Sequence, residues 1–330
     1  MTRKKGLRAL FFVATLLLAT YAAMRLWPQP ESGPPHLWVF YARVTGGREI
    51  LYGRQYSPSG KALGPSVRIG RLGLVQQVEV ATPGVHHSVW VTLGHEVDAL
   101  QGRHVVVTRL SPKNRTVLSV KDVAGSLYAV VENPAATTLS IDIWHHQGWH
   151  PLRSGLPLGI TSLVTGPAHS LWALSALPDE AVLTEIVGGH QVTASPPFQP
   201  QGTVGFAEGR PVLPYAFGSN GFGYWTGTRH IFYSVYQAAI SVTDTTPLWG
   251  LSVRGMVPFR RGQFDWADIV SWPQKQATTP TVIDGSGPWV AVLDGFSQGE
   301  WFNIETGKFG PAFQIKTPWW AVVRAASLGS

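Results

Sequence analysis

The stretch Ser88-Val89-Trp90-Val91-Thr92-Leu93 is the first clear copy of a pattern that recurs along this chain. Two further copies read Ser126-Leu127-Tyr128-Ala129-Val130-Val131 and Ser170-Leu171-Trp172-Ala173-Leu174-Ser175, and looser relatives surround Trp38, Trp225 and Trp289. Consecutive aromatic markers of these six segments are separated by 38 to 64 residues. Recurrence of one short segment at such a spacing indicates a structural repeat, so this pattern decides the fold.

Each repeat contains short strands separated by tight turns. Apolar runs are short and rich in Val, Ile, Trp and Tyr, and 36 Gly and 25 Pro residues punctuate the chain. This chemistry is typical of strands and turns rather than of helices. Residues 59–69 align with residues 306–315, including Ser59-Gly60-Lys61 with Thr306-Gly307-Lys308. We therefore expect the first and last repeats to be equivalent units of one fold.

Repeats of about 40 to 50 residues with four short strands each resemble the blades of the β-propeller superfamily. The resemblance covers residues 36–324 and implies an all-β fold with a single propeller of six four-stranded blades, or alternatively seven. Six blades require an insertion between Trp225 and Trp289, whereas seven require a degenerate blade there. Two β-sandwiches would not explain so many similar units. The repeats match no specific propeller class, so the resemblance implies the fold and no family activity.

The two ends of the repeat region predict how the ring closes. Trp38 is preceded only by a Pro-rich segment, so its blade lacks an innermost strand, while Trp319–Val323 follows a last blade that is already complete. If the extra C-terminal strand pairs with the strand of Trp38, two open sheet edges are removed. We expect Trp319–Val323 to become the innermost strand of the blade that contains Trp38, with residues 325–330 as a C-terminal tail.

The N-terminal residues 1–27 predict a membrane anchor. Four cationic residues between positions 3 and 8 precede a low-polarity stretch from Ala9 to Met24. Positive residues before an apolar segment hold that end in the cytoplasm, so the chain beyond the segment is exported. An uncleaved single-pass signal anchor is favoured, with a cleaved signal peptide as the alternative. Residues 28–35 hold four prolines and predict an extended spacer, which leaves the β domain on the extracytoplasmic side of the cell membrane.

Charge and cysteine content exclude several kinds of partner. The formal net charge is +7, but five of the 26 Lys and Arg residues lie in the first 25 positions and all 19 acidic residues lie after position 30. The exported domain therefore has a net charge of only +2, which argues against nucleic-acid binding. The absence of cysteine excludes a disulfide framework and a thiolate metal site. No cofactor is indicated.

The segment from Phe259 to Asp268 is the candidate binding site. It falls in the longest interval between markers, and departures from a repeat tend to map to loops on a binding face. Its paired cations, carboxylates and aromatic rings suit an anionic or carbohydrate-like ligand. The candidate ligand-binding residues are Arg260, Arg261, Asp265, Trp266 and Asp268. The alternative is an ion-paired loop that caps the edge of the propeller.

Histidines gather in two places, and both favour structural roles. The segment Trp144–His150 contains three histidines, but alternation along a hairpin lets only two of them converge on one face. His87 and His169 occupy equivalent positions in two repeats, which indicates a role in the repeat itself. We therefore predict no metal site.

Two functions remain open. The favoured one is a noncatalytic binding or scaffold module for an envelope partner protein or glycan, tethered to the membrane by its N-terminal helix. The alternative is a tethered carbohydrate-active enzyme, similar to glycoside hydrolases, with a carboxylate pair at the channel mouth. Asp265 or Asp268 would then act with one further acidic residue, for which the candidates are Asp284, Asp294, Glu300 and Glu305. No Gly-x-Ser-x-Gly motif occurs, which argues against a serine hydrolase.

Overall fold

The computed structural model places the folded unit at Pro35–Gly329, and its described residues fall between positions 33 and 328. The gaps within that range are 72–79, 82–87, 94–95, 102–103, 107–114, 134–137, 146–147, 157–158, 177–180, 188, 195–198, 201–203, 218–220, 227–229, 234–238, 244, 274–279, 287, 295–297 and 316–321. The predicted anchor and most of the spacer lie outside the described residues. Among the helices that are described, none has the length and apolar character needed to cross a bilayer.

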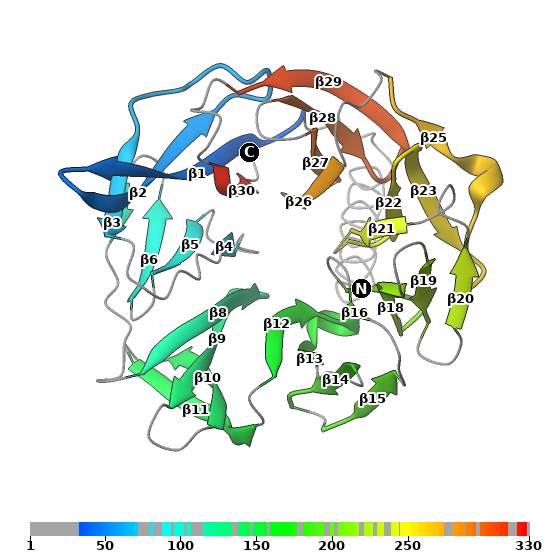
Figure 1. The fold of residues 1–330 in the computed structure, drawn as a ribbon, viewed down its shortest axis with the longest axis horizontal. Coiled ribbons are helices and arrows are strands. Elements are labelled where there is room, and N and C mark those ends of the chain that lie inside the picture. Colours follow the sequence, from blue (N-terminus) through cyan, green and yellow to red (C-terminus); the bar gives the residue numbers. More distant parts are fainter. Residues whose placement is uncertain are drawn as a thin grey trace, which may run out of the picture. The chain divides into compact units, whose positions relative to one another are not determined.

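The described strands form seven antiparallel sheets, which we number 1 to 7 in chain order (Figure 1). Sheet 1 contains β3 (Val67–Arg71), β2 (Arg48–Tyr56), β1 (His36–Thr45) and β30 (Val322–Leu328). Sheet 2 contains β4 (Val80–Ala81), β5 (Ser88–Leu93), β6 (Glu96–Gln101) and β7 (His104–Val106). Sheet 3 contains β8 (Thr116–Val123), β9 (Ser126–Asn133), β10 (Thr138–His145) and β11 (Gly148–Leu156).

The other four sheets are numbered 4 to 7. The described residues also include the short 3-10 helices η1 (Pro167–His169) and η3 (Trp266–Asp268). Sheet 4 contains β12 (Ile160–Thr165), β13 (Leu171–Ala176), β14 (Ala181–Glu185) and β15 (Gln191–Ala194). Sheet 5 contains β16 (Gln199–Pro200), β17 (Gly205–Ala207), β18 (Arg210–Phe217), β19 (Gly221–Trp225) and β20 (His230–Tyr233). Sheet 6 contains β21 (Ala239–Val242), β22 (Trp249–Ser252), β23 (Gly255–Arg260), β24 (Gln263–Phe264) and β25 (Val270–Ser271). Sheet 7 contains β26 (Pro280–Ser286), β27 (Trp289–Asp294), β28 (Gln298–Asn303) and β29 (Lys308–Gln314).

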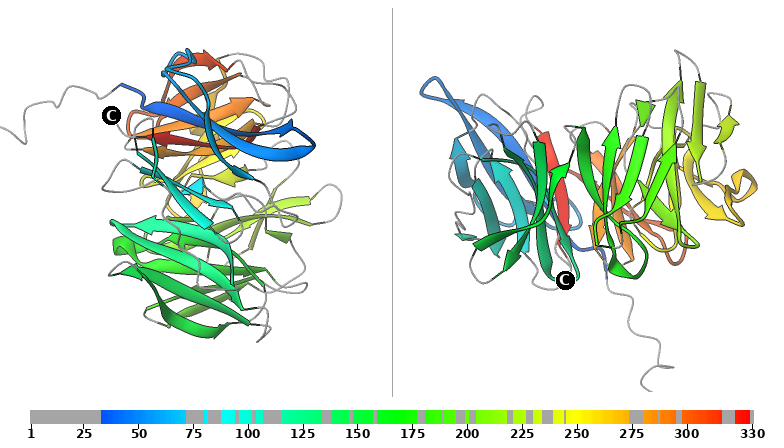
Figure 2. Two further views of the ribbon diagram at one scale, coloured as in Figure 1. Left: turned by 90° about the vertical axis from the view of Figure 1, so that its left-hand side faces the viewer. Right: turned by 90° about the horizontal axis from the view of Figure 1, so that it is seen from below.

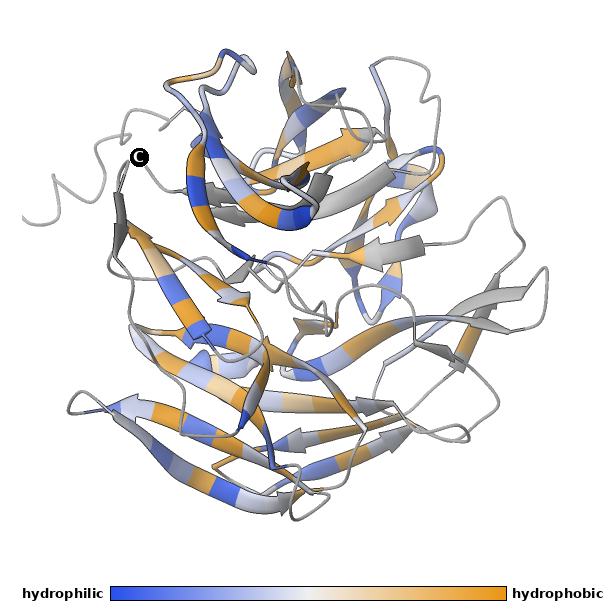
Figure 3. Ribbon diagram, turned by 60° about the vertical axis from the view of Figure 1, so that its left-hand side comes forward, coloured by the Kyte–Doolittle hydropathy of each residue, from blue (hydrophilic) through white to orange (hydrophobic). Residues whose placement is uncertain are grey.

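Alternating side chains make each sheet apolar on both faces. In β1, Trp38 and Phe40 pack against sheet 2, whereas Leu37 and Val39 pack against sheet 7, and all four are at most 1% exposed. This alternation comes from the two-residue period of a strand, because successive side chains point to opposite faces. Figure 3 shows the same alternation of hydrophobic and hydrophilic residues along many strands. Burial on both faces lets every sheet act as a wall between two neighbours.

Seven clusters of buried side chains join the sheets into a ring. Each cluster draws its residues from two neighbouring sheets, and the sequence of clusters runs from sheet 1 to sheet 7 and back to sheet 1. The ring is seen face-on in Figure 1 and from two sides in Figure 2. The prediction of an all-β, propeller-like fold built from four-stranded antiparallel units is therefore confirmed.

The sheets in the described part of the chain number seven, one more than the six blades favoured by the sequence. The interval between Trp225 and Trp289 holds sheet 6, not an insertion. Trp225 lies on the third strand of its sheet, whereas the other five markers lie on second strands. The spacing from Trp225 to Trp289 therefore did not reveal the sheet between them. The second strand of sheet 6 carries Leu248-Trp249-Gly250-Leu251-Ser252, which matches Leu171-Trp172-Ala173-Leu174-Ser175 and could have identified this sheet.

The two ends of the domain share sheet 1, as the sequence predicted. The C-terminal strand β30 pairs with β1 antiparallel, from Tyr41 opposite Val322 to His36 opposite Leu328. Its bounds differ from the expected ones, because residues 325–328 belong to the strand and not to a tail. Residues 319–321 lie outside the described part. Ring closure thus rests on backbone pairing between segments from opposite ends of the sequence.

The first and last repeats are equivalent in detail. Gly60 (φ 82°) lies between β2 and β3, and Gly307 (φ 65°) lies between β28 and β29, so the aligned glycines occupy corresponding turns. A Cβ atom on Gly60 would lie 2.2 Å from the carbonyl oxygen of Gln314. The indole Nε1 of Trp301 donates to the carbonyl oxygen of Pro58 at 2.9 Å. The first repeat therefore packs directly against the last one.

Candidate functional site

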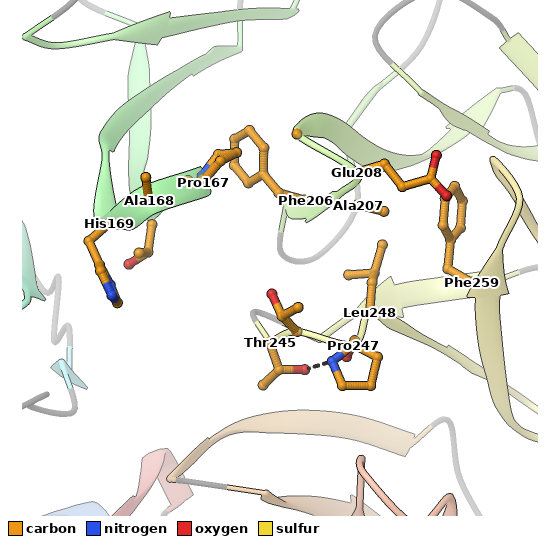
Figure 4. Close-up of a pocket in the computed structure, with 14 residues that line it drawn as sticks. Pro167, Ala168, His169, Phe206, Ala207, Glu208, Thr245, Pro247, Leu248 and Phe259 are labelled. Carbon is orange, nitrogen blue, oxygen red and sulfur yellow. Dashed lines mark hydrogen bonds between the residues drawn. The ribbon is translucent and has the colours of Figure 1, made fainter. Parts of the chain in front are cut away.

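A cavity of about 690 Å³ lies at one end of sheets 4, 5 and 6 (Figure 4). Its walls come from the connections between the first and second strands of each sheet, at residues 165–169, 206–209 and 245–248. In a repeated antiparallel sheet these connections fall at equivalent ends, which brings segments about 40 residues apart to one place. We call this end of the three sheets the pocket end.

The lining of the cavity combines apolar walls with a few polar side chains. Pro167, Phe206, Pro247, Leu248 and Phe259 supply the apolar walls. The polar side chains that line it are Thr165, Thr245, Thr246, His169 and Glu208. In Figure 4, His169 lies on one side of the cavity, across from Glu208 and Phe259. An apolar hollow with a small number of polar groups is typical of ligand-binding sites.

The turns at the pocket end contain non-glycine residues with a left-handed backbone conformation. Five described non-glycine residues have positive φ, and Ala168 (52°), His169 (59°) and Glu208 (51°) line this cavity. A left-handed conformation costs about 1–2 kcal/mol for a residue with a Cβ atom. Backbone hydrogen bonding closes the turn, since Ser170 N donates to the carbonyl oxygen of Pro167 at 3.0 Å. Such conformations cluster at functional sites, where the surrounding structure maintains them.

A second cavity of about 280 Å³ adjoins the first and is lined by cations. The two cavities share Ala207, Glu208 and Phe259. Arg210 from sheet 5 and Arg261 from sheet 6 line the second cavity, and both are exposed to solvent. Arg261 is a fourth left-handed residue, with φ 53° in the turn between β23 and β24. The pocket end therefore combines an apolar hollow with a cationic one.

The structure separates the site residues that the sequence grouped together. Arg261 lines the second cavity, whereas Arg260 donates from Nη1 to Oδ2 of Asp268 at 2.5 Å on the exposed outer part of sheet 6. Asp265 accepts from the backbone N–H of Ala267 at 3.3 Å and so caps the short helix η3. Ion pairing and capping agree with the alternative of an ion-paired loop for Arg260, Asp265 and Asp268.

Trp266 is half-buried and keeps part of its surface exposed. Its ring packs against Phe264 at 6.5 Å between centroids, beside the cluster that joins sheets 5 and 6. The segment belongs to a sheet, because β24 and β25 both pair with β23 and only η3 interrupts them. The segment therefore forms the interrupted outer part of sheet 6, with β24, η3 and β25 in place of one continuous outer strand. Ligand binding by these residues stays a prediction.

His169 is a site residue that sequence reasoning assigned to structure. It is exposed and lines the cavity, while the equivalent His87 lies outside the described residues. In the other group, Trp144 and Trp149 pack edge to face at 5.5 Å, and His145 and His150 are exposed. Among the described side chains no group of three or more potential metal ligands occurs.

Of the acidic residues proposed for catalysis, those with described side chains, Asp265, Asp268, Glu300 and Glu305, line neither cavity. Glu300 is buried on β28, and Glu305 is exposed in the turn after it. Asp284 and Asp294 belong to β26 and β27 of the same sheet. Of the described residues that line the two cavities, Glu208 is the one with an acidic side chain.

Asp98 is a perturbed carboxyl outside the pocket end. It lies on β6 of sheet 2 and is 2% exposed. Burial, together with a smaller effect of the charge on Glu96, raises the pKa of its carboxyl to about 6. Within the described part of the chain its Oδ1 atom has no hydrogen-bond partner. The charged form is therefore disfavoured in the folded protein.

No family model and no curated protein sequence matches this chain. Solved structures do match it. The dihydro-heme d1 dehydrogenase NirN is 12% identical over 87% of this chain and 75% of that chain, with a TM-score of 0.52. Virginiamycin B lyase from Staphylococcus aureus is 12% identical over 75% of this chain and 88% of that chain, with a TM-score of 0.50. A protein of unknown function from Bacteroides caccae is 8% identical over 90% of this chain and its full length, with a TM-score of 0.50. At these identities the likeness shows a β-propeller-like fold alone.

Proposed function

We propose that this chain is a membrane-anchored, extracytoplasmic β-propeller of seven blades that acts as a noncatalytic binding module. Its ligand is an envelope partner protein or glycan, held at the pocket end of sheets 4 to 6. The N-terminal segment 1–27 anchors the domain through a single helix, and residues 28–35 space it from the bilayer.

The cavity at the pocket end carries this proposal. It is built from three successive sheets, so the packing of the ring fixes the positions of its walls. Four residues with left-handed backbone conformations line it or the adjoining cavity. Its volume of about 690 Å³ falls in the range of small-ligand and side-chain sites. Apolar walls with a few polar side chains favour binding through shape and a few directed contacts.

The arrangement favours binding over glycoside hydrolysis. A two-carboxylate mechanism needs acidic groups about 5–10 Å apart on either side of the scissile bond. The described lining of the two cavities contributes Glu208 alone. One carboxylate is sufficient to orient a ligand through hydrogen bonds, and it lacks the second group that hydrolysis requires.

The proposal is tested by blocking the cavity. The domain from residue 31 onward would be immobilised as wild type, as Thr246→Trp and as Val253→Trp, and incubated with envelope proteins and glycans. Thr246 is exposed on the cavity wall, whereas Val253 is exposed in the turn between β22 and β23 at the other end of sheet 6. We expect a component that is retained by wild type and Val253→Trp and lost with Thr246→Trp. Equal retention by all three forms, or retention by none, would refute binding at this end.

A further inference from the structure

Two arginines from different sheets line one small cavity. Arg210 begins β18 in sheet 5, and Arg261 lies in the β23–β24 turn of sheet 6. Both line the cavity of about 280 Å³ beside the larger apolar one. Two like charges around one hollow repel each other, although water screens the repulsion in part. This arrangement favours a negatively charged group between them.

These cations remain available to a ligand. Among the described residues no ion pair involves Arg210 or Arg261, and Glu208 on the same cavity pairs with neither of them. Arg260, next in sequence, provides the contrast, because its guanidinium is bound to Asp268. Two arginines and one glutamate leave the second cavity with a net positive charge. The planar guanidinium fork suits a carboxylate, which can accept two parallel hydrogen bonds.

The adjoining cavity calls for an apolar group on the same ligand. Phe259 and Ala207 form part of both cavities, so one ligand can reach from the cationic hollow into the apolar one. The larger cavity has walls of proline, phenylalanine and leucine side chains. These walls accommodate a large apolar side chain, and the hydroxyl groups of Thr165 and Thr246 on the same cavity can hydrogen-bond to the backbone of the segment that carries it.

We infer that the ligand is a peptide segment that presents a carboxylate next to a large apolar side chain. The carboxylate lies between Arg210 and Arg261, and the apolar side chain enters the larger cavity. This inference rests on the proposed binding function and identifies the chemical class of the partner. It selects a protein partner over a glycan.

A display library of random 12-residue peptides, panned against the domain from residue 31 onward, tests the inference. We expect enrichment of Asp or Glu within two positions of Phe, Trp, Leu or Met. A synthetic peptide of the enriched sequence would then be measured by fluorescence anisotropy, beside a matched peptide in which Asn or Gln replaces the acidic residue. Arg210→Gln and Arg261→Gln should each weaken the acidic peptide about tenfold or more, and higher salt should weaken it as well.

The matched control is Arg254→Gln, which removes an exposed cation from the β22–β23 turn at the other end of sheet 6 and should leave peptide affinity unchanged. All three arginines are exposed, so each variant is expected to fold, and thermal melting would verify this. Enriched peptides without acidic residues, or equal affinity for wild type and Arg261→Gln, would overturn the inference and leave cavity binding intact. Cavity-dependent binding of glycans but not peptides would do the same. If Thr246→Trp affects no ligand at all, the proposed function fails as well.

Discussion

The junction between sheets 7 and 1 is closely packed, whereas the pocket end of sheets 4 to 6, built from the same repeat, contains a cavity. At the junction, Trp301 is fully buried, its indole donates to Pro58, and Gly60 packs so closely on Gln314 that a Cβ atom has no room. At the pocket end, sheets 4, 5 and 6 enclose a cavity, and Ala168 and His169 on its walls have left-handed backbone conformations.

The difference shows where this fold places stability and where it places a site. Close packing at the junction joins the two ends of the chain and removes an open edge, so it contributes to the stability of the whole ring. The left-handed turns at the pocket end carry a conformational cost and hold exposed side chains. We therefore expect substitutions where the ring closes to cost more stability than substitutions at the pocket end.

The largest effect is expected from removing the closing strand. Deleting residues 322–330 removes β30, which exposes the inner edge of β1 and opens the ring. We expect the thermal transition to lose cooperativity or to fall by more than about 10 °C, because β1 loses its backbone pairing with β30. Circular dichroism melts would measure it. A matched deletion of residues 329–330, outside the strand, should have no effect, and an unchanged melting temperature in the longer deletion would refute ring closure by β30.

Trp301→Ala should be the most damaging single substitution of the comparison. Trp301 is 0% exposed between sheets 7 and 1, and replacing a buried large aromatic by alanine costs about 3–5 kcal/mol. Trp266→Ala is the control, because Trp266 is half-buried on the outer part of sheet 6 and should cost less than about 2 kcal/mol. Urea denaturation would give both free energies of unfolding. Similar costs for the two variants would mean that the junction holds no special share of stability.

Asp98→Asn should stabilise the protein at high pH only. The pKa of Asp98 is raised to about 6 in the folded state, above its unfolded value near 4. The stability linked to its protonated form is fully present below pH 4 and is lost as pH rises through 6. We expect Asn, which cannot ionise, to add about 3 kcal/mol at pH 8 and close to nothing at pH 4. Melting temperatures of both proteins across that range would check it, and a gain that is independent of pH would contradict the assignment.

The smallest effect is expected at the pocket end. Ala168→Gly relieves a left-handed residue with φ 52° and should raise the free energy of unfolding by about 1 kcal/mol. Ala173→Gly, in the middle of β13, is the matched control and should lower it, because glycine weakens a strand interior. Chemical denaturation of both variants would measure the two changes. A loss of stability in Ala168→Gly would show that the turn carries no conformational cost.

Much of the fold could be predicted from local signals. The apolar marker segments, the short strands and the aligned turns at Gly60 and Gly307 all depend on neighbouring residues in the chain. The number of blades was predicted wrongly for two reasons. The marker Trp225 lies on a third strand, and the strand that contains Trp249 has only four residues and was not recognised as a repeat. Both errors concern strand position within a sheet, which a single aromatic residue does not reveal.

The candidate site was less accessible to the sequence. Arg260 and Arg261 are adjacent and chemically identical, yet one pairs with Asp268 and the other lines a cavity. The left-handed turn at Arg261 separates their directions, and no composition rule predicts which side chain faces sheet 5. The equivalence of His169 and His87 predicted a structural role, and its position beside residues 206–209 and 245–248 has no signal along the chain.

The sequence by itself determined that this chain repeats a short strand pattern, that tight turns separate its strands, and that its last strand completes its first sheet. These features come from side-chain alternation, turn chemistry and the pairing of open sheet edges. The first two depend on residues close together in the chain, and the third on two strands that each lack a partner. Only the tertiary structure decided that three turns about 40 residues apart enclose a cavity and that Arg210 and Arg261 meet beside it. That outcome depends on how whole sheets pack against each other, because the walls of a site between sheets have no counterpart in any single stretch of sequence.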